Sequence, residues 1–421
     1  MIIFHADPAR GGAERYTIDL ADGLRSRGHE VTLIASSFAG ESGVLLPVGW
    51  GTRRRKYLRF LDELDRHLTE HRYDIVHAML PVRRCDVYHP HAGIAAEAVA
   101  RGHMKHAGAL AQTAAMFANR TNLKRRTFVA VERELLTGQG VSFDSQSGDT
   151  GRGAPKPVPV SGKTHRSAST PTCGTQTDPL PLIGPKPPIV LCLSNYVMRD
   201  VTAHYPLAPD RLVRLFNAVD LKKFDPTQRP EVRSEIRQRF GLDPDRPVAL
   251  MIAQDFARKG LREAILAMHE LADDRLAMLV VGKEDPAVYQ KVARLLGIEK
   301  RVIFCGSTSD PFAFYRAADF FVLPTRHDPC SLVVLEALAM GLPVISTAFN
   351  GACEIMTDGR HGFVLADPAD VGALSGAMRR LLDATARREM SQACLALRPS
   401  LAYENHLDQL IAIYSRAQHR Q

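Results

Sequence analysis

Two carboxylates in one short stretch carry the most distinctive chemistry of this sequence. Asp328 and Glu336 are separated by seven residues within the segment 324–356. The pattern predicts a helix that has Asp328 as its N-cap, Pro329 as its first residue and Gly341 at its end. The free N–H groups and the dipole at its start would favour an anion such as a phosphate. The carboxylates would then lie roughly 12 Å apart by helical rise, so they could hold opposite ends of an extended ligand.

The elements around these carboxylates predict a strand–helix–strand unit. A short apolar strand at 320–323 precedes the helix and a buried strand at 343–347 follows it. Leu332, Leu335, Glu336 and Ala339 recur at helical spacing, which predicts one face packed against a sheet. The local pattern also allows a plainer interpretation, in which Asp328 is only a cap and Glu336 only a solvated helix residue.

The stretch resembles the acidic signature of the retaining GT-B glycosyltransferases of family 4, in which two Glu separated by seven residues precede an Ala-Xaa-Gly-Xaa-Pro-Val run. Residues 336–344 read Glu-Ala-Leu-Ala-Met-Gly-Leu-Pro-Val, whereas Asp328 replaces the first Glu. The resemblance implies that Glu336 binds the nucleotide ribose and that Asp328 lies beside the transferred sugar. It also implies that the backbone amides of the helix start stabilise the leaving diphosphate; these belong to Ser331, Leu332 and Val333.

Two cations and a later strand extend the resemblance. Arg258-Lys259-Gly260 lies between a predicted strand at 248–253 and a helix that begins at Leu261. Adjacent cations in a loop are often only solvated, but this order is similar to that of the lipopolysaccharide core glucosyltransferases and implies contact with the donor diphosphate. Gln254 stands where many members have Arg. The resemblance further implies that the loop around Phe304 and Cys305 contacts the nucleobase.

The first residues predict a β-α-β unit with glycines at the helix start. A strand at 1–6 leads through Gly11-Gly12 into a helix that ends at Gly28, and a strand at 31–36 follows. Glycine lets a phosphate approach the backbone, although a Gly-Gly pair is also common in structural turns. The run 11–15 resembles the first loop of family 4, where the glycines face the donor diphosphate. No GxGxxG motif accompanies it, which disfavours a nicotinamide enzyme.

A histidine-containing loop follows the strand that ends at Tyr88. His89 and His91 flank a proline, but no third residue stands at a spacing suited to a metal, and the resemblance implies catalysis without a metal cofactor. We expect His91 to lie near the transferred sugar or acceptor; an ordinary loop histidine is the alternative.

Two later segments, 101–128 and 138–188, differ in composition from the rest of the chain. Basic and apolar residues alternate over 101–128, which predicts contact with the anionic inner membrane surface, as the resemblance to core glucosyltransferases also implies. A solvated basic helix packed on its own sheet is the alternative. Residues 138–188 are rich in Gly, Ser, Thr and Pro, and we expect a disordered insertion there.

The composition is that of a globular protein with anionic partners. The chain has 421 residues, 45% of them hydrophobic and 24% charged, and a net charge of +8. Nucleic acid is disfavoured because the basic residues are not interleaved with stacking aromatics. Seven cysteines without a CxxC pair, no apolar run of about 18 residues and no signal-peptide pattern predict a cytoplasmic protein, peripheral on the membrane if 101–128 docks there.

Together these observations predict an α/β protein of GT-B type, with two Rossmann-like domains facing a cleft. We expect an acceptor-side domain at 1–212, a donor-binding domain at 213–400 and a helix at 401–421 that returns to the first domain. The expected reaction is retaining transfer of a sugar from a nucleoside diphosphate sugar to a glycan or lipid-linked acceptor in cell-envelope or lipopolysaccharide synthesis. A non-catalytic protein that binds sugar nucleotides or membranes, a phosphorylase and a nucleotide-sugar epimerase are alternatives.

Overall fold

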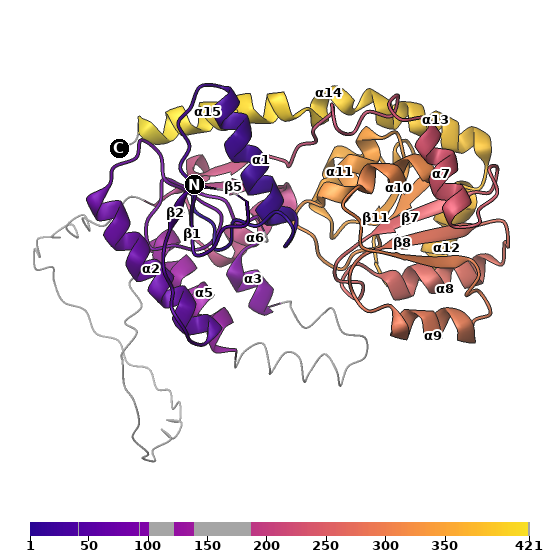
Figure 1. Cartoon of the computed structure of the whole chain (residues 1–421), viewed down its shortest axis with the longest axis horizontal. Coiled ribbons are helices and arrows are strands. Elements are labelled where there is room, and N and C mark those ends of the chain that lie inside the picture. The colour runs from indigo at the N-terminus through magenta and orange to yellow at the C-terminus, as the bar shows by residue number, and fades with distance from the viewer. Residues whose placement is uncertain (41, 92, 101–121, 139–186, 420–421) are drawn as a thin grey trace, which may run out of the picture.

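The chain folds into two lobes, each built on parallel β-strands with helices on both faces (Figure 1). The computed structural model describes residues 1–40, 42–91, 93–100, 122–138 and 187–419. Most of the predicted basic segment 101–128 and nearly all of the predicted insertion 138–188 lie outside these residues. Figure 1 shows the first lobe in indigo to magenta and the second in red to orange.

The first lobe contains two parallel sheets that Ile2 connects, because Ile2 forms isolated bridges with both Ile34 and Ala78. The strand order is β1-β2 in one sheet and β3-β4-β5-β6 in the other. The elements are α1 (Gly12–Ser26), β1 (Ile34–Ala35), β2 (Val44–Leu45), α2 (Arg53–Glu70), β3 (His77–Ala78), β4 (Val87–Tyr88), α3 (Ala95–Ala100), α5 (Leu123–Thr137), β5 (Ile189–Cys192), α6 (Asn195–His204), η1 (Pro209–Arg211) and β6 (Leu212–Arg214).

The second lobe has one six-stranded parallel sheet in the order β9-β8-β7-β10-β11-β12. The order reverses between β7 and β10, and ligands of open α/β sheets bind at the carboxyl ends of the strands beside such a reversal. The elements are α7 (Glu231–Arg239), β7 (Val248–Ile252), α8 (Leu261–Leu271), β8 (Ala277–Val281), α9 (Ala287–Leu295), β9 (Val302–Gly306), α10 (Pro311–Ala317), β10 (Phe320–Val322), α11 (Leu332–Ala339), β11 (Val344–Thr347), η2 (Gly351–Ile355), β12 (Gly362–Leu365), α12 (Val371–Arg380), α13 (Ala384–Ala396), α14 (Arg398–Leu401) and α15 (Tyr403–Gln418).

The start of α11 differs from the prediction. Asp328 does not cap this helix and Pro329 is not in it, because α11 begins at Leu332 after Ser331 as N-cap. The backbone N–H of Asp328 donates instead to Phe349 O, which ties the loop to the end of β11 (2.9 Å). The sequence predicted that one face of this helix is packed. In the structure α11 is buried on nearly all sides, as expected for a helix that is apolar all round.

The C-terminal helix α15 returns to the first lobe, where it runs along the top of the molecule in Figure 1. Its buried residues Leu407, Leu410 and Ile413 share a hydrophobic cluster with Leu20 and Leu24 of α1, so α15 completes the first lobe's core. At the other crossing, the predicted boundary after residue 212 falls inside β6, where residues 213 and 214 still pair with β5. The linker residue Ala218 avoids a positive φ, since the described non-glycine residues with positive φ are Arg229 and Ala272.

None of the helices in the described ranges is both long enough and apolar enough to cross a membrane.

Candidate active site

Two loops meet at the point where the strand order of the second lobe reverses. The loop after β7 carries Arg258 and Lys259, and the loop after β10 carries Asp328. Gly260 allows them to touch: its φ is +78°, and a Cβ there would lie 2.3 Å from Pro324 O. No larger residue could follow the two cations in this arrangement. The backbone N–H of Arg326 donates to Arg258 O (2.9 Å), which fixes the two loops to each other.

Lys259 and Asp328 form a buried ion pair. Their side chains meet through Nζ and Oδ2, and the residues are 8% and 7% exposed. Burial alone would raise the pKa of Asp328, but the charges of Lys259 and Arg258 outweigh it and hold this pKa below its usual value. Burial lowers the pKa of Lys259, and Asp328 opposes that change. The sequence assigned these residues separate roles, whereas the structure makes them one unit.

Arg258 lies beside this pair and is partly exposed. Its Nη1 donates to His327 O (2.8 Å) and its Nε lies 3.4 Å from Asp255 Oδ2. The exposed side of the guanidinium therefore supplies positive charge at the loop surface without a buried counterion of its own.

The N-terminus of α11 faces the first lobe. A Cβ at Gly12 would lie 3.4 Å from Leu332 Cδ1, so the start of α1 and the start of α11 approach each other closely. The N–H of Ser331 donates to Asn350 Oδ1 (3.2 Å). Among the residues that the structure describes, the N–H groups of Leu332 and Val333 have no acceptor, as expected for the first turn of a helix. Gly11 and Gly12 thus lie opposite two free donors.

Glu336 is held by a tyrosine from the neighbouring helix. Tyr315 Oη donates to Glu336 Oε2 (2.8 Å) and to Val333 O (3.2 Å). Burial raises the pKa of Glu336, while the Tyr315 hydrogen bond and the charges of Lys223 and Arg15 oppose the shift. The plainer interpretation of a solvated helix residue therefore does not describe Glu336. Nothing in the local pattern indicated Tyr315, because it lies 21 residues earlier in the chain.

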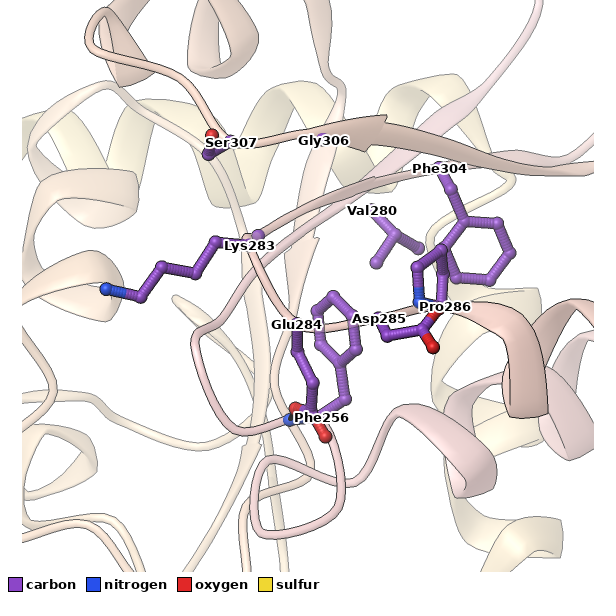
Figure 2. Close-up of a pocket in the computed structure, with 10 residues that line it drawn as sticks. Phe256, Val280, Lys283, Glu284, Asp285, Pro286, Phe304, Gly306 and Ser307 are labelled. Carbon is purple, nitrogen blue, oxygen red and sulfur yellow. Dashed lines mark hydrogen bonds between the residues drawn. The ribbon is translucent and has the colours of Figure 1, made fainter.

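A cavity of about 260 Å³ opens at the carboxyl ends of β7, β8 and β9 (Figure 2). Phe256, Val280 and Phe304 form its apolar part, and residues 282–286 and 306–307 form its polar part. In Figure 2 the side chain of Lys283 extends away from the apolar group. Phe304 thus lines a space next to the candidate site. Cys305 is not among the lining residues, and its Sγ contacts Ile303 O (3.5 Å).

His91 lies beside the linker between the lobes, near enough to Asp328 to feel its charge. Its Nε2–H donates to Asn217 Oδ1 (3.1 Å), and its ring packs on that of Tyr16 (4.6 Å between centroids). Burial lowers the pKa of His91 to about 4, although Asn217 and Asp328 oppose this, so the ring is neutral near pH 7. In the described ranges, no three His, Cys, Asp or Glu side chains are grouped as metal ligands.

Contacts between the lobes close the site, and the sequence analysis did not find them. Glu354 accepts hydrogen bonds from the N–H groups of Asn195 (2.8 Å) and Tyr196 (2.7 Å), so a residue of the second lobe caps α6 of the first. Ser194 Oγ donates to Pro329 O (2.7 Å), and Tyr196 Oη is hydrogen bonded to His327 Nδ1 (2.7 Å). These bonds span more than 130 residues of chain, so no local spacing could reveal them.

We expect Gly351→Ala to open this interface. A Cβ at Gly351 would lie 1.9 Å from Pro329 O and 2.2 Å from Ser194 Oγ. The loss should be about 1–3 kcal/mol in the free energy of unfolding, as for other overpacked sites, measured by urea denaturation. Gly376→Ala in α12 is the control, because nothing lies within 4 Å of its Cβ. Equal stability of the two variants would show that the lobes do not meet here.

Comparison with known families agrees with this arrangement. The family described as "Glycosyltransferase Family 4" matches residues 10–128, and that described as "Glycosyl transferases group 1" matches residues 232–394. Both lobes therefore match glycosyltransferase families, and the match to family 4 lies in the first lobe. The family 4 match covers the first lobe from the glycine turn to α5. The group 1 match includes the loops that carry Arg258, Lys259 and Asp328 and the helix that carries Glu336.

Several curated relatives are similar over part of the chain. The lipopolysaccharide glucosyltransferase WaaG of Escherichia coli K12 is 28% identical over 196 residues, which are 46% of this chain and 52% of WaaG. The alpha-D-kanosaminyltransferase of Streptomyces kanamyceticus is 30% identical over 233 residues, which are 53% and 59% of the two chains. This chain therefore spans about half the length of the curated relatives it matches.

Solved structures show that the fold is GT-B. The crystal structure of WaaG, a glycosyltransferase involved in lipopolysaccharide biosynthesis, superposes with a TM-score of 0.74 at 22% identity and covers 98% of both chains. The structure of Anabaena Alr3699/HepE in complex with UDP-glucose gives a TM-score of 0.64 at 14% identity, also with 98% of both chains. The predicted fold class is confirmed.

Proposed function

We propose that this protein is a retaining glycosyltransferase that moves a sugar from a nucleoside diphosphate sugar to a glycan or lipid-linked acceptor, in cell-envelope or lipopolysaccharide synthesis. The observation that carries the proposal is the convergence of Arg258, Lys259, Asp328 and the α11 N-terminus at the strand-order reversal, opposite Gly12. The donor would lie on the second lobe and the acceptor on the first.

The donor diphosphate would lie against the start of α11. The N–H groups of Leu332 and Val333 point from a helix N-terminus, which favours a dianion there. Arg258 and Lys259 would add positive charge as the bond to the sugar breaks, which is the electrostatic contribution that most lowers such a barrier. Lys259 already carries a counterion, Asp328. Binding of the diphosphate would therefore recruit Lys259 while Asp328 remains beside the sugar.

Glu336 would bind the ribose hydroxyls. Tyr315 holds one carboxylate oxygen (2.8 Å), which would leave the other oxygen for the ribose. The nucleobase would then extend toward the cavity beside Phe304, and Cys305 would contribute through its backbone.

The chemistry would proceed on one face of the sugar without a metal cofactor. Arg258 and Lys259 would balance the charge that builds on the leaving diphosphate, and that phosphate would help to take the proton of the acceptor hydroxyl. Asp328 would stabilise the positive character of the sugar carbon. His91, which is neutral, would contact the sugar or the acceptor as a hydrogen-bond partner.

We expect Glu336→Ala to weaken donor binding. A lost hydrogen bond to a charged group costs about 1.5–3 kcal/mol, or about tenfold to a hundredfold in Kd. Ligand-observed NMR with UDP, GDP, ADP and TDP sugars would measure this and identify the base. Glu299→Ala, an exposed carboxylate, is the control. Binding that is indifferent to Glu336, or no binding of any sugar nucleotide, would remove the donor site from the proposal. Donor binding without sugar transfer to any acceptor would favour a non-catalytic protein, and isomerisation of the donor would favour an epimerase.

We also propose that the first lobe docks on an anionic membrane surface. The helices α2 and α5 begin with the basic runs 53–56 and 124–126, and they lie side by side at these ends. Tyr57 stacks on Phe128 (4.1 Å between centroids). Cations oppose the dipole at a helix N-terminus, so these runs suit an external anion. Trp50, just before α2, is 95% exposed, and exposed tryptophan is typical of membrane interfaces.

Liposome flotation tests the membrane proposal. We expect Lys124→Gln/Arg125→Gln/Arg126→Gln to reduce binding to vesicles of phosphatidylglycerol and phosphatidylcholine about a hundredfold, since each cation near the surface contributes about 1 kcal/mol. Trp50→Ala should also weaken binding. Leu295→Ala is the control, an exposed apolar residue in α9 of the other lobe. Equal flotation with and without the anionic lipid would contradict the proposal.

A further inference from the structure

A second cavity, of about 510 Å³, lies in the second lobe on the side away from the donor loops. Ala318 and Asp319, just before β10, and Leu342, just before β11, lie in its wall. The cavity is therefore at the amino ends of these strands, whereas Arg258, Lys259 and Asp328 follow the carboxyl ends. Its volume is within the range of small-molecule sites, about 300–1,000 Å³.

The side chains around this cavity carry an excess of positive charge. Four arginines line it, Arg233, Arg316, Arg387 and Arg388, against one carboxylate, Asp319. That carboxylate is already paired, because Arg233 (2.7 Å) and Arg237 (2.9 Å) each donate to one of its oxygens. Burial lowers the pKa of Arg316, and the charge of Arg233 lowers it further. The fold thus holds several guanidinium groups together without matching acidic groups.

The four arginines differ in how many of their N–H groups are used by contacts within the protein. Arg233 has a structural role, because its Nη1 donates to the carbonyls of residues 316–318 at the end of α10. Arg316 Nη1 donates to Pro226 O (2.6 Å), but its Nε is buried with no partner in the described chain. Arg387 donates to Leu381 O (2.6 Å), and Arg388 makes one long contact with Thr385 Oγ1 (3.5 Å). Most N–H groups of Arg387 and Arg388 have no acceptor among the described residues.

We propose that this cavity is a binding site for a small molecule that carries a phosphate or diphosphate group, and that its occupation is coupled to the donor site. The planar guanidinium fork matches two phosphate oxygens at once. Arg387 and Arg388, neighbours in α13, would hold the anion from one side, and the charge of Arg316 would add to the attraction from α10.

Tyr315 connects this cavity to the donor site. Tyr315 is one of the residues that line the cavity, and its hydroxyl donates to Glu336 Oε2 and Val333 O in α11. The C-terminal end of α11, at Met340 and Gly341, lines the same cavity. A ligand that moves Tyr315 or α11 would therefore change the position of Glu336. This coupling rests on the proposed function, because it assigns Glu336 to the donor.

Hydrogen exchange with inorganic pyrophosphate tests the binding site without requiring activity. We expect pyrophosphate to slow amide exchange in α13 and, through Tyr315, in α11. Arg387→Gln/Arg388→Gln should raise the Kd measured from α13 at least about tenfold, because two charge-assisted donors are lost. Arg72→Gln/Arg133→Gln, exposed arginines of the first lobe, match this change in net charge and should leave the Kd unchanged. Protection confined to residues 254–261 and 324–333, or protection of α13 unaffected by Arg387→Gln/Arg388→Gln, would overturn the site.

Tyr315→Phe tests the coupling separately. The ring remains while its hydrogen bonds to Glu336 and Val333 are lost. We expect pyrophosphate to protect α13 in this variant as in the native protein but no longer to protect residues 334–339 of α11, which lie beyond the N–H groups assigned to the donor diphosphate. Protection of residues 334–339 that persists in Tyr315→Phe would overturn the coupling. Protection of α13 in a protein that binds no sugar nucleotide would support the cavity while the proposed donor site fails.

Discussion

Lys259→Met should lower the free energy of unfolding by about 3–5 kcal/mol, because it leaves the Asp328 carboxylate buried without its counterion. The double variant Lys259→Met/Asp328→Leu should recover most of this loss, since apolar residues can replace a buried ion pair at little cost. Urea denaturation of the single and double variants measures the difference. A double variant as unstable as Lys259→Met would show that the pair is not the source of the effect.

In the same two variants, the rate of sugar transfer should not follow the free energy of unfolding. Both variants lack the cation that we assign to the leaving diphosphate, so both should lose donor turnover by about a hundredfold or more. The matched control is Arg326→Met/Glu263→Leu, which replaces another ion pair of the second lobe (2.6 Å). We expect this control to retain donor binding within about threefold, as a site without a proposed ligand contact should. Recovery of turnover together with stability in Lys259→Met/Asp328→Leu would contradict the role of Lys259.

The second large effect should appear below pH 6.5, at a cluster of buried histidines. Burial lowers the pKa of His91 and of His406 to about 4, that of His77 to about 3, and that of His89 well below its usual value. A lowered pKa means that folding favours the neutral ring. Its stabilisation is therefore complete above the unfolded pKa near 6.5 and is lost as the pH falls from 6.5 toward 4.

The cluster joins α15 to the first lobe, so acid should release this helix. His406 Nδ1 donates to Phe216 O (2.8 Å), hence its Nε2 accepts from Tyr16 Oη (2.6 Å). His77 is hydrogen bonded to Tyr414 of α15 (2.7 Å). Burial raises the pKa of carboxyls as well, and folding then favours their protonated form, which opposes the histidine effect in acid; these groups are Asp19, Glu132 and Glu336.

Those carboxyls offset part of the stability that the whole protein loses in acid. The comparison with His406→Gln is therefore the sharper measurement. From pH 7.5 to pH 5, the native protein should lose about 2 kcal/mol more than the variant, the linkage expected for one group with pKa values near 6.5 and 4. Urea denaturation across this range measures it. His29→Gln, an exposed histidine, is the control. Equal losses in the native protein and His406→Gln would show that His406 does not titrate on unfolding.

Local patterns predicted much of the element order. The helix predicted between the Gly11-Gly12 turn and Gly28 is α1, because burial of one helix face imposes the same period on sequence and structure. The helix start at Asp328 was wrong for a physical reason: an acidic residue before a proline is typical of an N-cap, but the carboxylate of Asp328 is held by Lys259 instead.

The resemblance to family 4 and much of the order of strands and helices could be predicted from the sequence, because glycine turns, apolar periodicity and the Glu336–Val344 run are local properties of the chain. Which functional groups share a site became visible in the folded chain alone. Lys259 meets Asp328 across 69 residues, Tyr315 meets Glu336 across 21, and Glu354 caps α6 across more than 150. These contacts follow from the reversal of strand order between β7 and β10 and from the closure of the two lobes. No spacing along the chain encodes a contact that depends on how two sheets face each other.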